Sequence, residues 1–223
     1  MKKAVVLLSG GLDSTTALYW AKAKGYQCHC LIFDYGQRHR REIESAKKIA
    51  QKAGVSFDVI AIKLGWTGRS ALLDLDVKLP NIPLEKIGQG PIPSTYVPGR
   101  NTLFTAYAIS AADALGAEAI VLGPNVLDYS GYPDCRPEYY QAFRRVARLG
   151  TKRGVEGKSL KILTPLIKMT KAQIVKLGAQ LGVPWELTWS CYAGGARPCG
   201  QCDSCKLRAK GFEKAKIQDL IYA

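Results

Sequence analysis

The sequence has no apolar run of the roughly 20 residues that a membrane-spanning helix needs. Near the N-terminus, the apolar run at residues 4–8 is too short for a signal peptide and is interrupted by a serine and two glycines. Internal repeats and low-complexity tracts are also missing. We therefore expect a cytoplasmic globular protein without a membrane partner.

Acidic residues are scarce, with 18 Asp and Glu against 32 Lys and Arg, so the net charge is +14. Such an excess favours polyanionic partners: nucleotide phosphates, acidic substrates or nucleic acid. An ordinary solvated surface is the alternative explanation. One group of basic side chains keeps RNA as a secondary hypothesis: Arg144, Arg145, Arg148, Lys152, Arg153 and Lys158.

Histidine is almost absent, with 2 residues, and neither lies near the C-terminal cysteines. Those cysteines have the spacing C-x7-C-x2-C-x2-C and are Cys191, Cys199, Cys202 and Cys205. Four thiolates typically form a closed tetrahedral site, which predicts one structural zinc ion per chain. An iron–sulfur cluster is the competing interpretation, and four reduced thiols without a metal are the third. Cys28 and Cys30 lie on one face of a predicted strand, as core residues do.

Strand-like and helix-like segments alternate along the chain, which predicts a doubly wound parallel sheet of five strands. The expected strands are residues 4–8, 27–33, 57–62, 118–122 and 161–163. The expected helices are residues 15–22, 38–53 and 102–115, one that begins at Pro137, and one after a Thr170–Gln173 capping box. Residues 63–98 show no period and contain many prolines and glycines, which is typical of a functional lid or a disordered segment.

The stretch SGGLDSTT, residues 9–16, links the first strand to the first helix. Its two glycines and the helix N-terminus expose backbone N–H groups to an anion. Asp13 can either cap the helix or hold a divalent ion beside a phosphate. The Walker pattern is missing, so this is a different kind of phosphate loop. Further polar residues follow the other predicted strands, at Asp34, residues 123–125 and Thr164, where parallel sheets bind ligands.

The loop resembles the SGGxDS pyrophosphatase loop (PP-loop) of enzymes that split ATP into AMP and pyrophosphate. Together with DYGQRH at residues 34–39, VPGRN at 97–101, LDYSGYPDCR at 127–136 and the four cysteines, it resembles the 7-cyano-7-deazaguanine synthase (QueC) family. These segments span most of the chain, and the last two are the most specific. Pro124 departs from the expected small aliphatic residue, at a position without an assignable chemical role.

The resemblance implies a ligase that forms carbon–nitrogen bonds in queuosine and 7-deazaguanine biosynthesis. It would convert 7-carboxy-7-deazaguanine and ammonia to 7-cyano-7-deazaguanine (preQ0), using ATP with Mg²⁺ and adenylated acid and amide intermediates. The implied catalytic residues are Asp13, Ser9 and Ser14. The implied ATP-binding residues are Leu8, Ser9, Gly10, Gly11, Leu12, Asp13, Ser14, Thr15, Thr16, Ala17 and Leu18.

Substrate contacts are expected from Arg100, Asn101, Tyr132, Asp134 and Arg136. Asp134 would pair with the guanine-like edge, Tyr132 would stack on the base, and an arginine would bind the carboxylate. Each has a structural alternative: a core ring for Tyr132, a turn for Asp134, and surface or lid ion pairs for the arginines.

The expected organisation is a nucleotide-binding domain at residues 1–185, with the lid at 63–98, and a zinc-binding helical region at 186–223. A homodimer that acts on small molecules, with no nucleic-acid partner, is expected. A PP-loop enzyme that thiolates tRNA is one alternative function, and a nucleotide-binding module without turnover is another.

Overall fold

The computed structural model describes residues 1–64, 66, 69–126 and 131–222. Its centre is a parallel sheet with the strand order β3-β2-β1-β4-β5. The strands are β1 (Lys2–Leu7), β2 (Tyr26–Asp34), β3 (Ser56–Ala61), β4 (Ala119–Val121) and β5 (Lys161–Leu163). The chain runs from β1 outward to β3, and then returns to add β4 on the other side of β1. The predicted five-stranded parallel sheet is therefore confirmed. The strand order reverses between β1 and β4, and sheets of this kind bind ligands at such a switch point.

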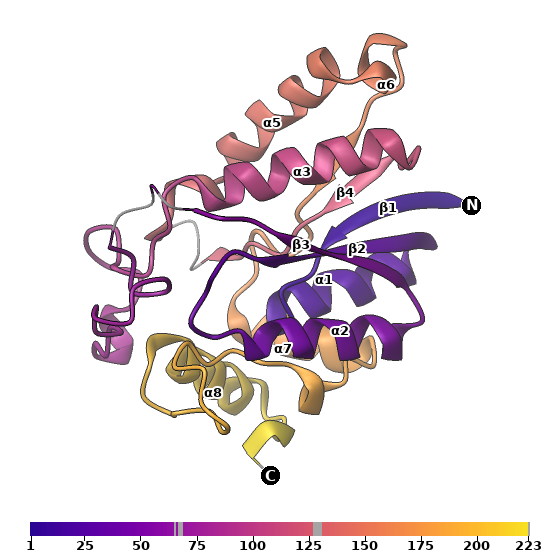
Figure 1. Ribbon diagram of the computed structural model, residues 1–223. Helices are drawn as coiled ribbons and strands as arrows, with labels where there is room; N and C mark the ends of the chain where they lie inside the picture. Colours follow the sequence, from indigo (N-terminus) through magenta and orange to yellow (C-terminus); the bar gives the residue numbers. More distant parts are fainter. Residues whose placement is uncertain (65, 67–68, 127–130, 223) are drawn as a thin grey trace.

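Helices cover both faces of the sheet (Figure 1). One face carries α1 (Leu12–Ala23), α2 (Arg41–Ala53) and α7 (Lys171–Gln180), and the other carries α3 (Arg100–Ala114) and α5 (Pro137–Gly150). The remaining elements are α6 (Lys152–Val155), α8 (Asp203–Ala215) and the 3₁₀ turns η1 (Leu84–Lys86), η2 (Pro133–Cys135), η3 (Trp185–Leu187) and η4 (Leu220–Tyr222). None of the helices in the described part of the chain is long and apolar enough to cross a membrane.

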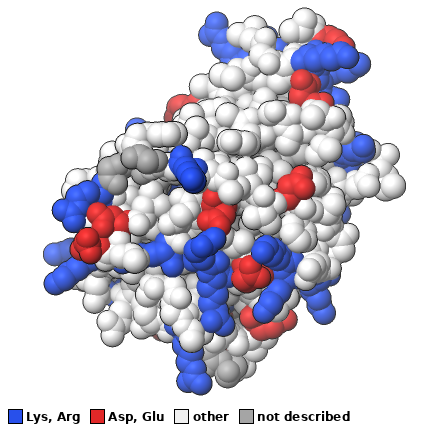
Figure 2. All heavy atoms as spheres, viewed as in Figure 1, with Lys and Arg blue, Asp and Glu red and all other residues white. Residues whose placement is uncertain are grey.

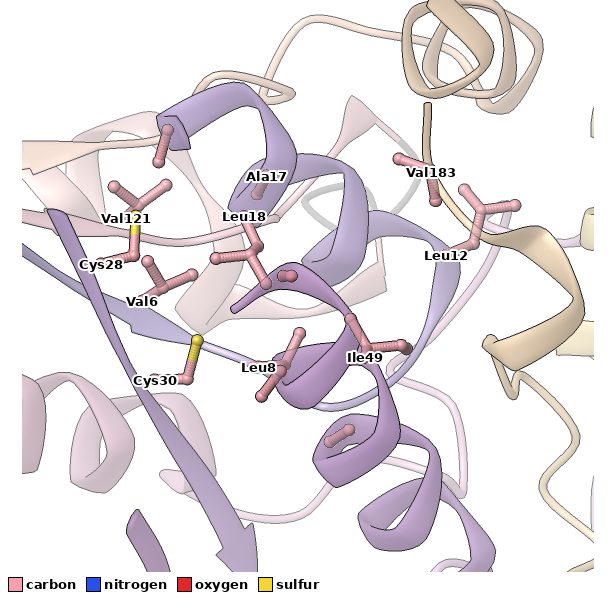
Figure 3. Packing of buried hydrophobic residues seen from close by; sticks show 14 of the residues in the cluster. Val6, Leu8, Leu12, Ala17, Leu18, Cys28, Cys30, Ile49, Val121 and Val183 are labelled. Atoms are coloured by element: carbon pink, nitrogen blue, oxygen red, sulfur yellow. The ribbon is translucent and has the colours of Figure 1, made fainter. Parts of the chain in front are cut away.

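Alternate residues of the central strands divide the core into two apolar layers. Val6 and Leu8 pack with α1 and α2 on one face, while Val5 packs with α3 on the other. Figure 3 shows Cys28 and Cys30 among the first set, next to Val6 and Val121. Burial raises the pKa of Cys28 to about 11, so its thiol stays protonated at neutral pH. The prediction that both cysteines are core residues is confirmed.

Three helices begin at different residues from those expected. The helix α1 starts at Leu12 rather than residue 15. The helix α2 starts at Arg41 rather than residue 38 because residues 38–40 form a turn. Arg38 uses that turn to reach residues 71–77, donating to the carbonyls of Ala71, Leu75 and Val77 at 3.0–3.2 Å. The helix α3 begins earlier than expected, at Arg100, following Gly99 with a φ of 65°.

The predicted lid, residues 63–98, contains one short regular element in its described part, η1. Its two ends are anchored, since Ala71, Leu72 and Val97 are buried. Between them, the chain passes beside α8, where Lys206 Nζ donates to Asn81 Oδ1 at 2.5 Å and to the Ile82 carbonyl at 2.7 Å. The segment therefore bridges the core and the C-terminal helix.

The C-terminal helix α8 packs against α7 and adds Phe212 and Ala215 to the core layer below the sheet. Gly211 permits this approach, since a Cβ there would lie 3.0 Å from the Lys171 Cβ. A buried ion pair between Arg208 and Asp219 ties the end of the chain to α8. The C-terminal region, residues 186–222, is thus attached to the core through α8.

Candidate functional site

A cavity of about 290 Å³ opens at the carboxyl ends of β1 and β4. The glycine loop and the first turn of α1 form its floor, with Ser9, Gly11 and Asp13 in the wall. The start of α3 and the segment after η3 close the sides, through Arg100 and Trp189. The cavity therefore lies at the switch point that the topology singles out.

The glycine loop is held by its own serines. Ser14 Oγ accepts the Ser9 N–H at 3.1 Å and lies 3.0 Å from Ser9 Oγ, while donating to the Gly11 carbonyl at 3.2 Å. Gly10 has a φ of 79°, and a Cβ there would lie 2.4 Å from the Glu42 carbonyl oxygen. Only glycine fits this position, because both the backbone conformation and the contact with α2 exclude a side chain.

The first turn of α1 points its backbone N–H groups toward the cavity. Gly11 is the N-cap and has no side chain that could accept a hydrogen bond from the first N–H groups of α1. The first N–H groups of a helix have no partner within it, and the helix dipole makes this end positive. An anion such as a phosphate fits here.

The expected ATP-binding segment divides into two parts. Those of its residues that line the cavity are Leu8, Ser9, Gly11, Leu12, Asp13 and Ser14. Gly10 lies against α2. The hydroxyl groups of Thr15 and Thr16 donate to the Gly11 and Leu12 carbonyls. Ala17 and Leu18 are fully buried in the core. The second part therefore anchors α1.

Asp13 does not cap the helix; its carboxylate points across the cavity. Oδ2 accepts a hydrogen bond from Asn125 Nδ2 at 3.2 Å and forms an ion pair with Lys171 Nζ. Oδ1 is buried and has no hydrogen-bond partner among the described residues. An unpaired buried carboxylate oxygen beside an anion-binding helix end fits a divalent cation bound to phosphates.

Sequence reasoning placed Asn125 at the ligand-binding edge of the sheet without giving it a role, and it did not select Lys171. Lys171 is the first residue of α7, after the confirmed Thr170–Gln173 capping box. A cation at a helix N-terminus opposes the helix dipole, and that unfavourable placement was the available signal. Gly123 lets β4 approach closely, because a Cβ there would lie 3.1 Å from the Asp13 backbone.

Three of the expected substrate-binding residues line the cavity: Arg100, Asn101 and Tyr132. Arg100 Nη1 donates to the Tyr35 hydroxyl at 3.3 Å, and its guanidinium lies 5.8 Å from the centre of that ring. The Tyr132 hydroxyl lies 2.7 Å from Thr95 Oγ1, which fixes the ring against the lid segment. A cation and an aromatic ring therefore form part of the cavity wall.

The other two expected substrate residues lie outside the cavity wall. Asp134 is buried, and its Oδ2 accepts the Asn101 N–H at 3.1 Å, which caps α3. Arg136 is exposed at the start of α5. Leu127–Ser130 of the same motif lies outside the described residues.

The four C-terminal cysteines come together as predicted. Their sulfurs lie within 4.8 Å of one another, with Cys199 exposed and the other three buried, so the cluster could hold a metal ion. The backbone N–H groups of Cys199 and Cys202 donate to sulfurs of the cluster at 3.3 and 3.4 Å. Hydrogen bonding from Cys205, opposed by burial, lowers the pKa of Cys202 to about 5. Hydrogen bonds of this kind favour thiolates, the form that binds metals.

Two members of the basic group make contacts within the chain. Arg144 donates to the Ile162 carbonyl at 2.9 Å, supporting β5, and Lys158 pairs with Glu156 at 3.0 Å. Figure 2 shows Lys and Arg side chains spread over the visible face, with acidic side chains between many of them. In the described part of the chain, this arrangement gives little support to an RNA-binding surface.

Comparison with known proteins finds similar sequences over nearly the whole chain. The family model described as Queuosine biosynthesis protein QueC matches residues 3–216. The 7-cyano-7-deazaguanine synthase of Trichodesmium erythraeum is 53% identical over 219 residues, covering 97% of this chain and 98% of that protein. The enzyme of the same name from Acinetobacter baylyi is 55% identical over 219 residues, covering 97% of this chain and 93% of its own.

Solved structures share the fold at low identity. An NMN synthetase from Francisella tularensis has a TM-score of 0.50 and 18% identity, covering 96% of this chain and 77% of its own. A 4-thiouridine synthetase, solved with RNA and bound ATP, has a TM-score of 0.50 and 20% identity, covering 96% of this chain and 50% of its own. The family match over residues 3–216 and the identities above 50% together show that this chain belongs to the QueC family of queuosine biosynthesis proteins.

Proposed function

We propose that this chain is a 7-cyano-7-deazaguanine synthase, which joins ammonia to 7-carboxy-7-deazaguanine in an ATP-dependent reaction and yields the nitrile preQ0. The observation that carries the proposal is the unpaired Asp13 Oδ1 beside the glycine loop at the sheet's switch point. The near-full-length relatives named for this activity support it.

The chemistry needs two activations at one phosphate site. The substrate carboxylate attacks the α-phosphate of ATP, pyrophosphate leaves, and the acyl adenylate forms. Ammonia displaces AMP and gives the amide. The amide oxygen then attacks a second ATP, pyrophosphate leaves again, and loss of AMP with a proton leaves C≡N. A loop that holds pyrophosphate and exposes the α-phosphate serves both rounds.

Within this scheme, the N–H groups at the start of α1 bind the leaving pyrophosphate, and the hydroxyls of Ser9 and Ser14 support its oxygens. Asp13 would hold Mg²⁺ through its unpaired oxygen, and the ion would supply charge neutralisation on the phosphates. Lys171 and Asn125 keep the carboxylate oriented. Arg100 lies in the wall where it can pair with the substrate carboxylate.

The cysteine cluster would hold one zinc ion. Four thiolates leave no open coordination position, so the ion would be structural. The segment at residues 63–98 would close over the cavity and exclude water, which hydrolyses acyl adenylates. The protein would act as a homodimer on small molecules.

The test is mass spectrometry of the product from 7-carboxy-7-deazaguanine, ATP and ammonium, with AMP and pyrophosphate quantified. The proposal predicts the nitrile, with two AMP formed per nitrile. A parallel reaction would add tRNA and a sulfur donor. AMP formation only with tRNA would favour a thiolating enzyme, and ATP binding without AMP formation would favour a binding module; either result would contradict the proposal.

A further inference from the structure

A second, smaller pocket of about 100 Å³ adjoins the nucleotide cavity. It lies between residues 82–95 and the start of α8, which run beside each other in Figure 1. Four residues line both spaces: Tyr132, Tyr192, Ser204 and Leu207. Because the two spaces share this wall, a molecule in the small pocket would lie next to a nucleotide in the larger one.

One side chain of the small pocket is a carboxylate with spare hydrogen-bonding capacity. Asp203 is 8% exposed and accepts one long hydrogen bond, from the Ile82 N–H at 3.4 Å. Within the described residues it forms no ion pair shorter than 4.0 Å. The nearby Lys206 is instead bonded to Asn81 and to the Ile82 carbonyl. A buried carboxylate normally accepts several hydrogen bonds, so Asp203 is suited to a ligand with N–H donors.

We propose, resting on the function proposed above, that this pocket binds the six-membered ring of the deazaguanine substrate. Asp203 accepts hydrogen bonds from the N–H groups along one edge of that ring. A guanine-type ring presents N1–H and the 2-amino group side by side, and the two oxygens of a carboxylate can accept both hydrogens. The 7-carboxylate sits on the other ring. It extends past Tyr132 and Tyr192 into the larger cavity, toward the glycine loop.

The other carboxylates near the site are already engaged. Asp13 is paired with Lys171, next to the phosphate-binding helix end. Glu42 accepts a hydrogen bond from the side-chain amide of Gln37 at 3.0 Å, and its other carboxylate oxygen lies 3.2 Å from His39 Nε2. Asp134 caps α3 and lines neither space in the described part of the chain. Asp203 is therefore the carboxylate best placed for base recognition.

The experiment compares the wild-type protein with Asp203→Asn by isothermal titration calorimetry. The two ligands are 7-carboxy-7-deazaguanine and its analogue without the 2-amino group. The wild-type protein should bind the first at least about tenfold more tightly, because the analogue leaves a buried carboxylate oxygen unpaired. Asp203→Asn should bind both ligands equally and weakly. Its affinity for ATP and its metal content should equal those of the wild type.

A second variant protects the test against a folding defect at Asp203. Gly131 lines the small pocket but not the larger cavity, and a Cβ there would meet Pro93 at 3.9 Å. The position therefore has room for a β-carbon, and the methyl groups of Gly131→Val would add volume at the pocket wall. It should weaken base binding and leave ATP affinity unchanged. The opposite pattern, weaker ATP binding with normal base binding, would contradict the proposal.

Three outcomes separate the two proposals. If Asp203→Asn keeps the 2-amino preference, the assignment of Asp203 is overturned while the proposed function stands. If Asp134→Asn loses the preference instead, the base lies at the start of α3. If the wild-type protein binds neither base, the proposed function itself fails, and the assignment of this pocket fails with it.

Discussion

The Trp189 backbone N–H donates to the Gly10 carbonyl at 2.8 Å, which ties the cysteine region to the glycine loop. Trp189 is two residues before Cys191, and its indole N–H donates to the Cys191 carbonyl at 2.9 Å. Arg41 of α2 lies over the indole ring at 4.7 Å. The cysteine cluster and the proposed ATP loop therefore share a short, buried link.

Loss of the metal should consequently affect both stability and ATP binding. Cys202→Ser removes one of four ligands, so we expect metal content to fall, the melting temperature to drop and the Kd for ATP to rise. Elemental analysis, a melting curve and ATP titration measure these three quantities. Cys28→Ala changes a core cysteine far from the loop and should leave metal content and ATP affinity intact. Unchanged ATP affinity in metal-free protein would contradict the proposed link.

Lys171 should matter for turnover because its ammonium faces Asp13 across the cavity. Lys171→Met keeps the length of the side chain but removes the charge. Losing one charged hydrogen bond, worth about 1.5–3 kcal/mol, should lower kcat/KM for ATP by about tenfold to a hundredfold. Steady-state pyrophosphate release measures this change. A matched control is Lys47→Met on α2, whose partner Glu44 is exposed. Equal activity of the two variants would contradict a role for Lys171 in turnover.

Alanine substitutions at two glycines with similar backbone conformations can separate the cost of backbone strain from the cost of a steric clash. Gly10 and Gly54 have φ values of 79° and 66°, but a Cβ at Gly54 would meet nothing within 4 Å. Gly54→Ala should cost about 1–2 kcal/mol of unfolding free energy, from the left-handed conformation alone. Gly10→Ala should cost more and also weaken ATP binding, because the loop must move away from α2. Urea unfolding with ATP titration tests the pair, and equal costs would argue against the close contact.

The lid hypothesis predicts uneven hydrogen exchange along residues 63–98. Amides near Ala71 and Val97 should exchange slowly without ligand, because both residues are buried. Amides of residues 82–95 should exchange faster and become protected when ATP and substrate bind. Exchange that is the same with and without ligands would contradict closure of this segment.

Local patterns were enough to predict the sheet, the glycine loop and the cysteine cluster. Alternating strands and helices specify a parallel sheet, and cysteine spacing specifies a cluster, since both follow from neighbours in sequence. Contacts between distant segments carry no such pattern. The bond from Asp134 to the Asn101 N–H joins η2 to α3, and the pair between Asp13 and Lys171 spans 158 positions. The contact of Asp134 with the start of α3 could therefore not be predicted from the sequence, and its expected role at the substrate stays a prediction.

The central claim is that Asp13 holds a metal against the phosphates of ATP. Asp13→Asn keeps the size of the side chain and an oxygen acceptor for Asn125 and Lys171, but removes the charge. The matched control is Asp58→Asn, which changes an exposed carboxylate that is hydrogen-bonded to His29. The decisive measurement is kcat for pyrophosphate release, taken beside a melting curve for each protein. We predict that Asp13→Asn lowers kcat by about a hundredfold or more with little change in melting temperature, while Asp58→Asn stays active. Full activity of Asp13→Asn, or a loss explained by a large fall in its melting temperature, would contradict the account.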